Sequence, residues 1–186
     1  MNNGRAVFLD RDGVINRALV REGKPYPPDT LAQLEVLPGV PEALARLKAA
    51  GYQLIVVTNQ PDVARGRQTR AAVEEMHQAL AAQLPIDAFQ VCYHDDADRC
   101  ACRKPAPGLL LAAARDWQLD LSASYLVGDR WRDVEAGRRA GCATILIDYG
   151  YAEPAGSPPD ARVRSLPEAV DWILSRSQAR SQDRGT

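Results

Sequence analysis

The sequence predicts a doubly wound α/β domain of the Rossmann-like type, in which helices cover both faces of a parallel sheet. Short apolar runs alternate with helical patterns along the 186 residues, as expected of repeated strand–helix units. The runs are almost continuous in valine, isoleucine and leucine, which is typical of strands buried on both faces. Gly51 and Gly141 each stand where a helix would end, just before the next apolar run.

The expected elements follow one another in a regular order. The strands are the five apolar runs, namely Ala6–Leu9, Gln53–Thr58, Phe89–Tyr93, Ser124–Val127 and Ala143–Asp148. The helices are the periodic segments, namely Val40–Ala50, Arg70–Gln83, Gly108–Gln118, Asp133–Ala140 and Glu168–Ser175. Residues 17–36 are rich in proline and suit a loop or a small β flap over the strand ends. Residues 1–174 are expected to form a single domain, and the polar residues 175–186 a disordered tail.

Composition and charge limit the possible partners. Hydrophobic residues make up 46% of the chain and charged residues 25%, which suits a single core with an ordinary polar surface. The formal net charge of −1 argues against a dedicated nucleic-acid or membrane binder. No apolar run approaches the roughly 20 residues that span a bilayer, and the first residues lack the apolar segment of a signal peptide. We therefore expect a cytoplasmic protein, and we expect it to be a monomer.

Two acids follow the first expected strand. In the run AVFLDRDGVIN, Asp10 and Asp12 come directly after the apolar residues, and Gly13 follows. Side chains at positions i and i+2 of an extended chain point to the same side, so the two carboxylates would repel each other unless a cation compensates. An ordinary acidic turn and a metal site with a nucleophilic aspartate explain this stretch equally well.

Further polar residues stand next to the other expected strands and helices. They are Thr58, Asn59 and Gln60 after the second strand, Arg103 and Lys104 before the third crossover helix, and Asp129 and Asp133 after the fourth strand. Ligands of open α/β sheets bind outside the carboxyl ends of the strands, so we expect these side chains to form one site.

This set of residues suits phosphoryl transfer. Asp10 and Asp129 could supply carboxylates to a hard divalent cation such as Mg²⁺. Asp10 could attack phosphorus to form an aspartyl-phosphate, while Asp12 could protonate the leaving alkoxide and later deprotonate water. Thr58 and Lys104 could hold the equatorial phosphate oxygens, on which charge is spread in the transition state.

Four motifs in order, FLDRDG, VVTNQ, RKP and GDRWRD, resemble those of the haloacid dehalogenase superfamily of phosphatases. The resemblance extends from the first to the last expected strand. It implies Asp10 as nucleophile, Asp12 as general acid/base, and Thr58 and Lys104 as phosphate anchors. The implied Mg²⁺ ligands are Asp10, Asp129 and the backbone carbonyl of Asp12, with Asp133 as a further ligand or a close neighbour. No large insertion follows the first or third strand, which implies a type without a cap domain.

The cysteines suggest a second metal. Cys92, His94, Cys100 and Cys102 form the pattern C-x-H-x5-C-x-C. Three thiolates and an imidazole complete a tetrahedral shell, so we expect structural Zn²⁺ in a loop at residues 92–102. Unrelated buried thiols beside an exposed histidine would explain this clustering poorly. Outside the loop, Cys142 is expected to be an ordinary buried thiol and His77 a surface or packing residue.

Together, DRDGVIN, TNQ and a Cys/His loop running into CRKP resemble the D-glycero-D-manno-heptose 1,7-bisphosphate 7-phosphatases of ADP/GDP-heptose and lipopolysaccharide biosynthesis. The resemblance implies a phosphorylated sugar as substrate and a role for Arg103 in recognising it. Arg130 stands where that family commonly has lysine, and Pro61-Asp62 departs from the family pattern, which Arg65 still matches. A bisphosphate needs a second anion site, which Arg103 could form with Arg130 or Arg65.

Three other functions stay open. A histidinol-phosphate phosphatase, the nearest relative, would need a polar or acidic partner for imidazole and ammonium, whereas arginines are abundant here. A polynucleotide 3′-phosphatase would share the carboxylate pair, but it is disfavoured by the zinc loop and by the lack of a basic stripe. A non-catalytic zinc-binding module would have no need for the intact set of acids and lysine.

Overall fold

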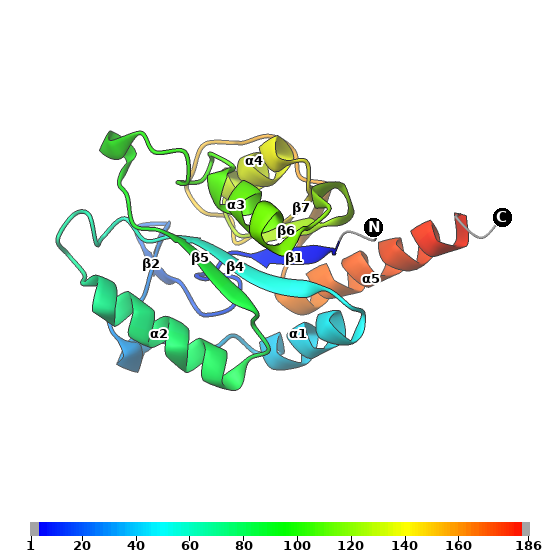
Figure 1. Ribbon diagram of the computed structural model, residues 1–186. Coiled ribbons are helices and arrows are strands. Elements are labelled where there is room, and N and C mark those ends of the chain that lie inside the picture. Colours follow the sequence, from blue (N-terminus) through cyan, green and yellow to red (C-terminus); the bar gives the residue numbers. More distant parts are fainter. Residues whose placement is uncertain (1–3, 184–186) are drawn as a thin grey trace.

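The computed structural model describes residues 4–183, and at its centre lies a six-stranded sheet (Figure 1). Its strands are β1 (Ala6–Leu9), β4 (Gln53–Asn59), β5 (Ala88–Cys92), β6 (Tyr125–Gly128), β7 (Ala143–Ile147) and β8 (Ala161–Val163). Their order across the sheet is β5-β4-β1-β6-β7-β8, and every neighbouring pair is parallel. This topology confirms the predicted doubly wound α/β class.

Helices cover both faces of the sheet (Figure 1). They are α1 (Val40–Ala49), α2 (Arg70–Gln83), α3 (Gly108–Trp117), α4 (Trp131–Ala140) and α5 (Leu166–Asp183), with short 3-10 helices η1 (Leu31–Gln33), η2 (Asp96–Asp98) and η3 (Leu121–Ala123). Helices α3 and α4 lie on one side of the sheet, and α1, α2 and α5 lie on the other. No helix in the described part of the chain is long and apolar enough to cross a membrane.

Strand β1 supplies both halves of the core. Its four residues are completely buried, and successive side chains point to opposite faces of the sheet. Val7 and Leu9 pack in the cluster beneath α1 and α5, whereas Ala6 and Phe8 pack in the cluster beneath α3 and α4. Because β1 pairs with β4 on one side and β6 on the other, its carboxyl end is fixed at the middle of the sheet edge.

The segment between β1 and α1 forms the small flap that the sequence predicts. Strands β2 (Leu19–Arg21) and β3 (Lys24–Tyr26) pair antiparallel in a two-stranded sheet of their own. Within residues 4–183 this pair and the six-stranded parallel sheet are the sheets of the structure.

Three elements differ from expectation. Strand β8 has only three residues, ARV, too short and polar for the apolar pattern to reveal. Helix α4 begins at Trp131 rather than Asp133. Helix α5 continues to Asp183, into the expected tail. Its extension is anchored at Ser177, whose hydroxyl accepts a hydrogen bond from Arg5 Nη1 at 2.9 Å and lies 2.9 Å from the Tyr52 hydroxyl. Residues 184–186 of that expected tail lie outside the described part of the chain.

Candidate active site

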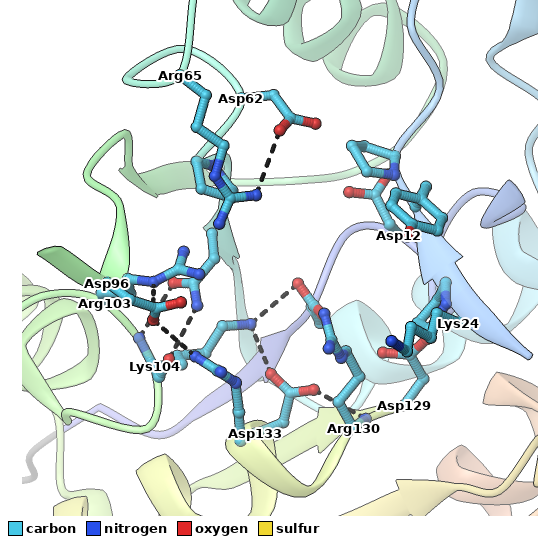
Figure 2. Close-up of a pocket in the computed structure, with 17 residues that line it drawn as sticks. Asp12, Lys24, Asp62, Arg65, Asp96, Arg103, Lys104, Asp129, Arg130 and Asp133 are labelled. Atoms are coloured by element: carbon cyan, nitrogen blue, oxygen red, sulfur yellow. Dashed lines mark hydrogen bonds and ion pairs between the residues drawn. The ribbon is translucent and has the colours of Figure 1, made fainter. Parts of the chain in front are cut away.

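The carboxyl ends of the central strands open into one pocket (Figure 2). Asp10 follows β1, Asn59 ends β4, and Asp129 follows β6. The flap contributes Lys24 to Pro27 to the same lining, and the loop before α3 contributes Arg103 and Lys104. This is the convergence expected from the sequence, because parallel strands bring their carboxyl ends to one edge of the sheet.

Lys104 lies at the bottom of this pocket, buried between two acids. Its Nζ is 3.0 Å from Asp10 Oδ1 and 2.6 Å from Asp133 Oδ1, and it donates to the Val57 carbonyl at 2.7 Å. Figure 2 shows the lysine reaching towards Asp133. Although burial alone would lower it, the pKa of Lys104 is raised by the two aspartates, so the ammonium stays charged.

Asp10 has one oxygen engaged by the protein. Its Oδ1 accepts the backbone N–H of Arg11 at 2.8 Å and faces Lys104, and these are the hydrogen-bonding and ionic contacts that the described residues give this carboxylate. Burial raises the pKa of Asp10 to about 6, against the opposing effect of Lys104. The carboxylate is therefore still mostly ionised at neutral pH, with Oδ2 available to a metal ion or a phosphorus atom.

Asp129 is the acid that most needs a cation. Although the hydroxyl of Tyr151 interacts with this carboxyl and lowers its pKa, both oxygens of Asp129 are buried, and within residues 4–183 neither has a partner at full hydrogen-bonding geometry. Burial, followed by the charges of Asp10 and Asp133, raises its pKa well above the usual value. A ligand oxygen from each of these three acids lies within 4.8 Å of the others, which is the spacing of a metal site. A β-carbon at Gly13 would lie 2.0 Å from Asp129 Oδ2, so glycine is required at this position of the segment that follows β1.

Asp133 carries out two structural tasks at the start of α4. Its Oδ1 binds Lys104, and its Oδ2 accepts the backbone N–H of Arg130 at 3.1 Å. That second bond is the arrangement of an acid three residues into a helix that satisfies the free N–H before it, and it explains why α4 begins ahead of Asp133. With both oxygens engaged, Asp133 is better placed as a neighbour of a metal ion than as its ligand.

Asp12 also lines the pocket (Figure 2). Three side chains donate to it: Asn16 at 2.9 Å, Gln60 at 2.9 Å, and Arg11 through Nε and Nη2, both at 3.1 Å. Arg11 itself is completely buried. The orientation of Asp12 is thus fixed by donors from the segments that follow β1 and β4.

The three polar residues at the end of β4 occupy different positions. Asn59 lines the pocket and exchanges two hydrogen bonds with the backbone of Lys104, each 3.0 Å long. Gln60, expected to bind substrate, is instead buried, is absent from the lining, and donates to Asp12 and to the Thr58 hydroxyl. Thr58 is 1% exposed and is likewise absent from the lining.

The rim of the pocket carries arginines, each paired with an acid. Arg65 donates to Asp95 through Nε at 2.9 Å and Nη2 at 2.6 Å. Arg130, which immediately precedes α4, donates to Glu153. The predicted anion-binding residues are therefore present at the pocket, but carboxylates of the protein occupy them.

Two further arginines share a single acid. Arg103 Nε and Arg132 Nη1 donate to the same oxygen of Asp96, at 2.8 and 3.0 Å. Arg103 was expected at the site, whereas neither Arg132 nor Asp96 was. The positions of these two residues depend on how η2 lies against α4, and no motif in the sequence indicates that approach.

The four expected zinc ligands lie together beside the pocket. Cys92 ends β5, and its Sγ is 3.6 Å from that of Cys100 and 3.1 Å from that of Cys102. His94 Nδ1 is 3.7 Å from Cys92 Sγ and 3.3 Å from Cys102 Sγ. Tetrahedral zinc with bonds of about 2.3 Å requires sulfurs about 3.8 Å apart, whereas a disulfide requires about 2.05 Å. The cluster fits a metal ion, and its cysteines are free thiols.

The model of one enzyme family, the haloacid dehalogenase-like hydrolases, matches residues 17–141, more than half of the chain. The chain belongs to the haloacid dehalogenase-like hydrolases. The resemblance that the four motifs indicate is thereby confirmed.

Several characterised or solved hydrolases of this family are similar along almost the whole chain. The D-glycero-beta-D-manno-heptose-1,7-bisphosphate 7-phosphatase of Bordetella bronchiseptica is 39% identical over 186 residues, which cover 93% of this chain and 99% of the relative. The enzyme of the same name from Escherichia coli is 36% identical over 183 residues, with coverage of 91% and 88%. A crystal structure of D,D-heptose 1.7-bisphosphate phosphatase from B. bronchiseptica, complexed with magnesium and phosphate, gives a TM-score of 0.77 at 32% identity and covers 92% of this chain and 99% of that one.

The sequence predicted the site residues that the order of the parallel strands brings together at one edge of the sheet. What the sequence did not reveal is the set of buried or paired groups that support those residues. His77, expected at the surface or in packing, is buried against Phe89, with ring centres 4.6 Å apart, and contacts Arg11. The i, i+4 spacing of helix positions Val73 and His77 could have placed the histidine on the buried face of α2.

Proposed function

We propose that this chain is a metal-dependent phosphatase that removes the C7 phosphate of D-glycero-D-manno-heptose 1,7-bisphosphate. The observation that carries the proposal is the buried group of Asp10, Asp129 and Lys104 at the floor of a pocket with an arginine-rich rim. This arrangement places a nucleophile, a cation site and a charged donor around one phosphoryl position. The names of the two relatives described above support the choice of substrate.

The proposed reaction has two displacements at phosphorus. Asp10 Oδ2 forms a bond to phosphorus as the bond to the sugar oxygen breaks, and Asp12 gives its proton to that oxygen. Water then attacks the aspartyl-phosphate, its proton passes to Asp12, and inorganic phosphate leaves with Asp10 restored. Lys104 and the Thr58 hydroxyl are proposed to hold the equatorial oxygens through both steps.

Two metal ions are part of the proposal. Asp10, Asp129 and the backbone carbonyl of Asp12 would hold Mg²⁺, which neutralises phosphate charge when bound. The buried oxygens of Asp129, which lack a partner at full hydrogen-bonding geometry within residues 4–183, support this assignment. The cluster of three cysteines and His94 would hold Zn²⁺ with a complete shell, and its task would be to fix the loop that leads into Arg103.

For substrate recognition we propose that Asn59 acts through Lys104, and that Arg65, Arg103 and Arg130 act at the rim. The position of Gln60 supports a different role for that residue, which is to orient Asp12 and Thr58 from beneath. The expectations of a monomer, of a cytoplasmic location, and of no nucleic-acid or membrane partner remain predictions.

The deciding experiment compares kcat/KM for both C1 anomers of the heptose bisphosphate and for histidinol phosphate, with Mg²⁺ present. We expect a preference of at least ten-fold for one of the bisphosphates, since one charge-assisted contact to a second phosphate is worth about 1.5–3 kcal/mol. A preference for histidinol phosphate would contradict the proposed substrate. Release of no phosphate from any phosphomonoester would contradict the proposed activity, and Asp10→Asn provides the inactive control.

A further inference from the structure

The carboxylate of Asp96 lies at the pocket between two arginines from different parts of the chain. Its Oδ1 accepts from Arg103 Nε at 2.8 Å and from Arg132 Nη1 at 3.0 Å. Arg103 follows the cysteine cluster, Arg132 belongs to the first turn of α4, and all three residues line the pocket (Figure 2). A single carboxylate oxygen therefore occupies the point where two guanidinium groups converge.

The two arginines are more firmly fixed than the acid that joins them. The side chain of Asp96 is 59% exposed, against 11% for Arg103 and 26% for Arg132. Arg132 also lies over the ring of Trp131, with its guanidinium carbon 5.2 Å from the ring centre. Ion pairs of such exposed carboxylates hold weakly, so the acid can move out while the guanidinium groups stay in position.

Arg132 has a donor that the protein does not use. Its Nε is buried and has no hydrogen-bond partner within the described residues 4–183. A buried N–H without an acceptor is unfavourable, and an anion of several oxygens could use donors of Arg132 that Asp96, bound only at Nη1, leaves free. The donor set of this pair is thus larger than one carboxylate oxygen requires.

The other rim pairs differ in the exposure of the acid, although Arg130, like Arg132, has a buried Nε without a partner among residues 4–183. Glu153, the partner of Arg130, has a side chain only 12% exposed. Asp95 binds Arg65 through both of its oxygens and is 28% exposed, less than the 34% of its arginine. Asp96 differs from both acids because it is more exposed than either of its arginines.

We propose that Asp96 is a displaceable occupant of the subsite for the phosphate that is not cleaved, and that Arg132 joins Arg103 in binding that phosphate once Asp96 has moved out. This rests on the proposed function, which it deepens by naming how the second phosphate is recognised. A phosphate dianion carries more charge than a carboxylate and offers three oxygens to the two guanidinium groups. A neutral sugar hydroxyl has neither property, so it leaves Asp96 in place and gains nothing from these arginines.

The test compares the heptose 1,7-bisphosphate with the heptose 7-phosphate as substrates of Asp96→Asn and Arg132→Met. For Asp96→Asn we expect KM for the bisphosphate to fall about three- to ten-fold, because the neutral amide competes less for the arginines. For Arg132→Met we expect that KM to rise about ten-fold or more. With the 7-phosphate, which lacks the second phosphate, we expect KM to change by less than about two-fold in both variants, because no charged contact is lost.

Asp98→Asn is the matched control, since it removes the same charge from the same short helix. Asp98 accepts the backbone N–H of Asp95 at 2.7 Å, a bond that the amide oxygen of asparagine can keep. We expect it to leave the ratio of the two KM values as in the wild-type protein. Melting temperatures of all variants establish that they are folded.

Three results would overturn the inference. A higher bisphosphate KM in Asp96→Asn would mean that the acid holds the arginines in place, and an unchanged one would mean that it does not compete with phosphate. Equal effects of Arg132→Met on both substrates would remove that arginine from the distal subsite. If the wild-type protein shows no preference for the bisphosphate, the proposed substrate is wrong. This measurement is made on the wild-type protein alone, so it is distinguished from a failure of the inference about Asp96 and Arg132.

Discussion

His77 Nε2 lies 3.2 Å from Nη1 of Arg11, whose other nitrogens donate to Asp12. A guanidinium can only donate hydrogen bonds, so Nε2 must accept and the imidazole must be neutral, with its proton on Nδ1. His77 is held in this orientation by stacking on Phe89. A neutral histidine on α2 therefore orients the arginine that in turn orients the candidate acid/base.

This contact predicts an acid-dependent loss of stability. Burial, followed by the charge of Arg11, lowers the pKa of His77 to about 4, against about 6.5 in an unfolded chain. Between these two values the unfolded chain binds more protons than the folded one, so stability falls as pH decreases. The loss from this group approaches about 3 kcal/mol near pH 4.

The variant His77→Phe tests this, because it keeps an aromatic ring against Phe89 and removes the titration. Its melting temperature at pH 7.5 should lie below that of the wild-type protein, since Arg11 loses an acceptor. The difference should shrink steadily towards pH 4.5, because only the wild-type protein has a histidine to protonate. If the difference in melting temperature between the two proteins stays constant from pH 7.5 to pH 4.5, His77 is not a neutral, buried group.

How much of this site was predictable depends on what sets each position. Asp10, Asp129 and Lys104 were predictable, because the parallel strand order brings their segments to one edge of the sheet. The contact of Arg11 with His77 was not, because it depends on the rotation of α2 about its axis. The pairing of Arg132 with Asp96 was also hidden, since it depends on how η2 lies against the start of α4, for which the sequence carries no periodic signal.

Asp129 and Asp133 should respond oppositely to removal of charge. Asp129→Asn removes a buried charge that Asp10 and Asp133 repel, and the amide can keep the contact with the Tyr151 hydroxyl, so the metal-free melting temperature should stay level or rise. Asp133→Asn weakens the contact with Lys104 and should lower that temperature, since disrupting a buried pair costs about 3–5 kcal/mol. Calorimetric melts with and without Mg²⁺ measure both effects.

The same melts test the metal site. Mg²⁺ should raise the melting temperature of the wild-type protein through linkage, and Asp129→Asn should abolish that rise. If this variant is destabilised in the absence of metal, Asp129 must have a stabilising partner, and its assignment as the acid that awaits a cation would be wrong.

Asn59 should act on the rate through Lys104. Its side chain exchanges two hydrogen bonds with the backbone of that lysine, so Asn59→Ala leaves the lysine loop free to shift. Because displacements of about 1 Å can reduce rates about 100-fold, we expect kcat to fall at least ten-fold with KM changed much less. A rise in KM at constant kcat would instead indicate direct contact between Asn59 and substrate. Circular dichroism of the variant checks that the sheet is intact.

The cysteine cluster should hold one zinc ion per chain and thereby position the segment that carries Asp96 and Arg103. Cys100→Ser should lose that zinc and melt about 10 °C lower or more, since each kcal/mol corresponds to about 2–4 °C in a chain of this size. Metal analysis and calorimetry measure these changes. Cys142→Ser is the control, because Cys142 is buried in the core and is not one of the four clustered ligands, so this variant should keep the zinc. Because Arg103 directly follows the expected zinc ligand Cys102, loss of zinc should displace that arginine and raise KM for the bisphosphate. The affinity for Mg²⁺, which depends on β1 and β6, should stay as in the wild-type protein. An unchanged KM in zinc-free Cys100→Ser would show that the arginines keep their places without the metal.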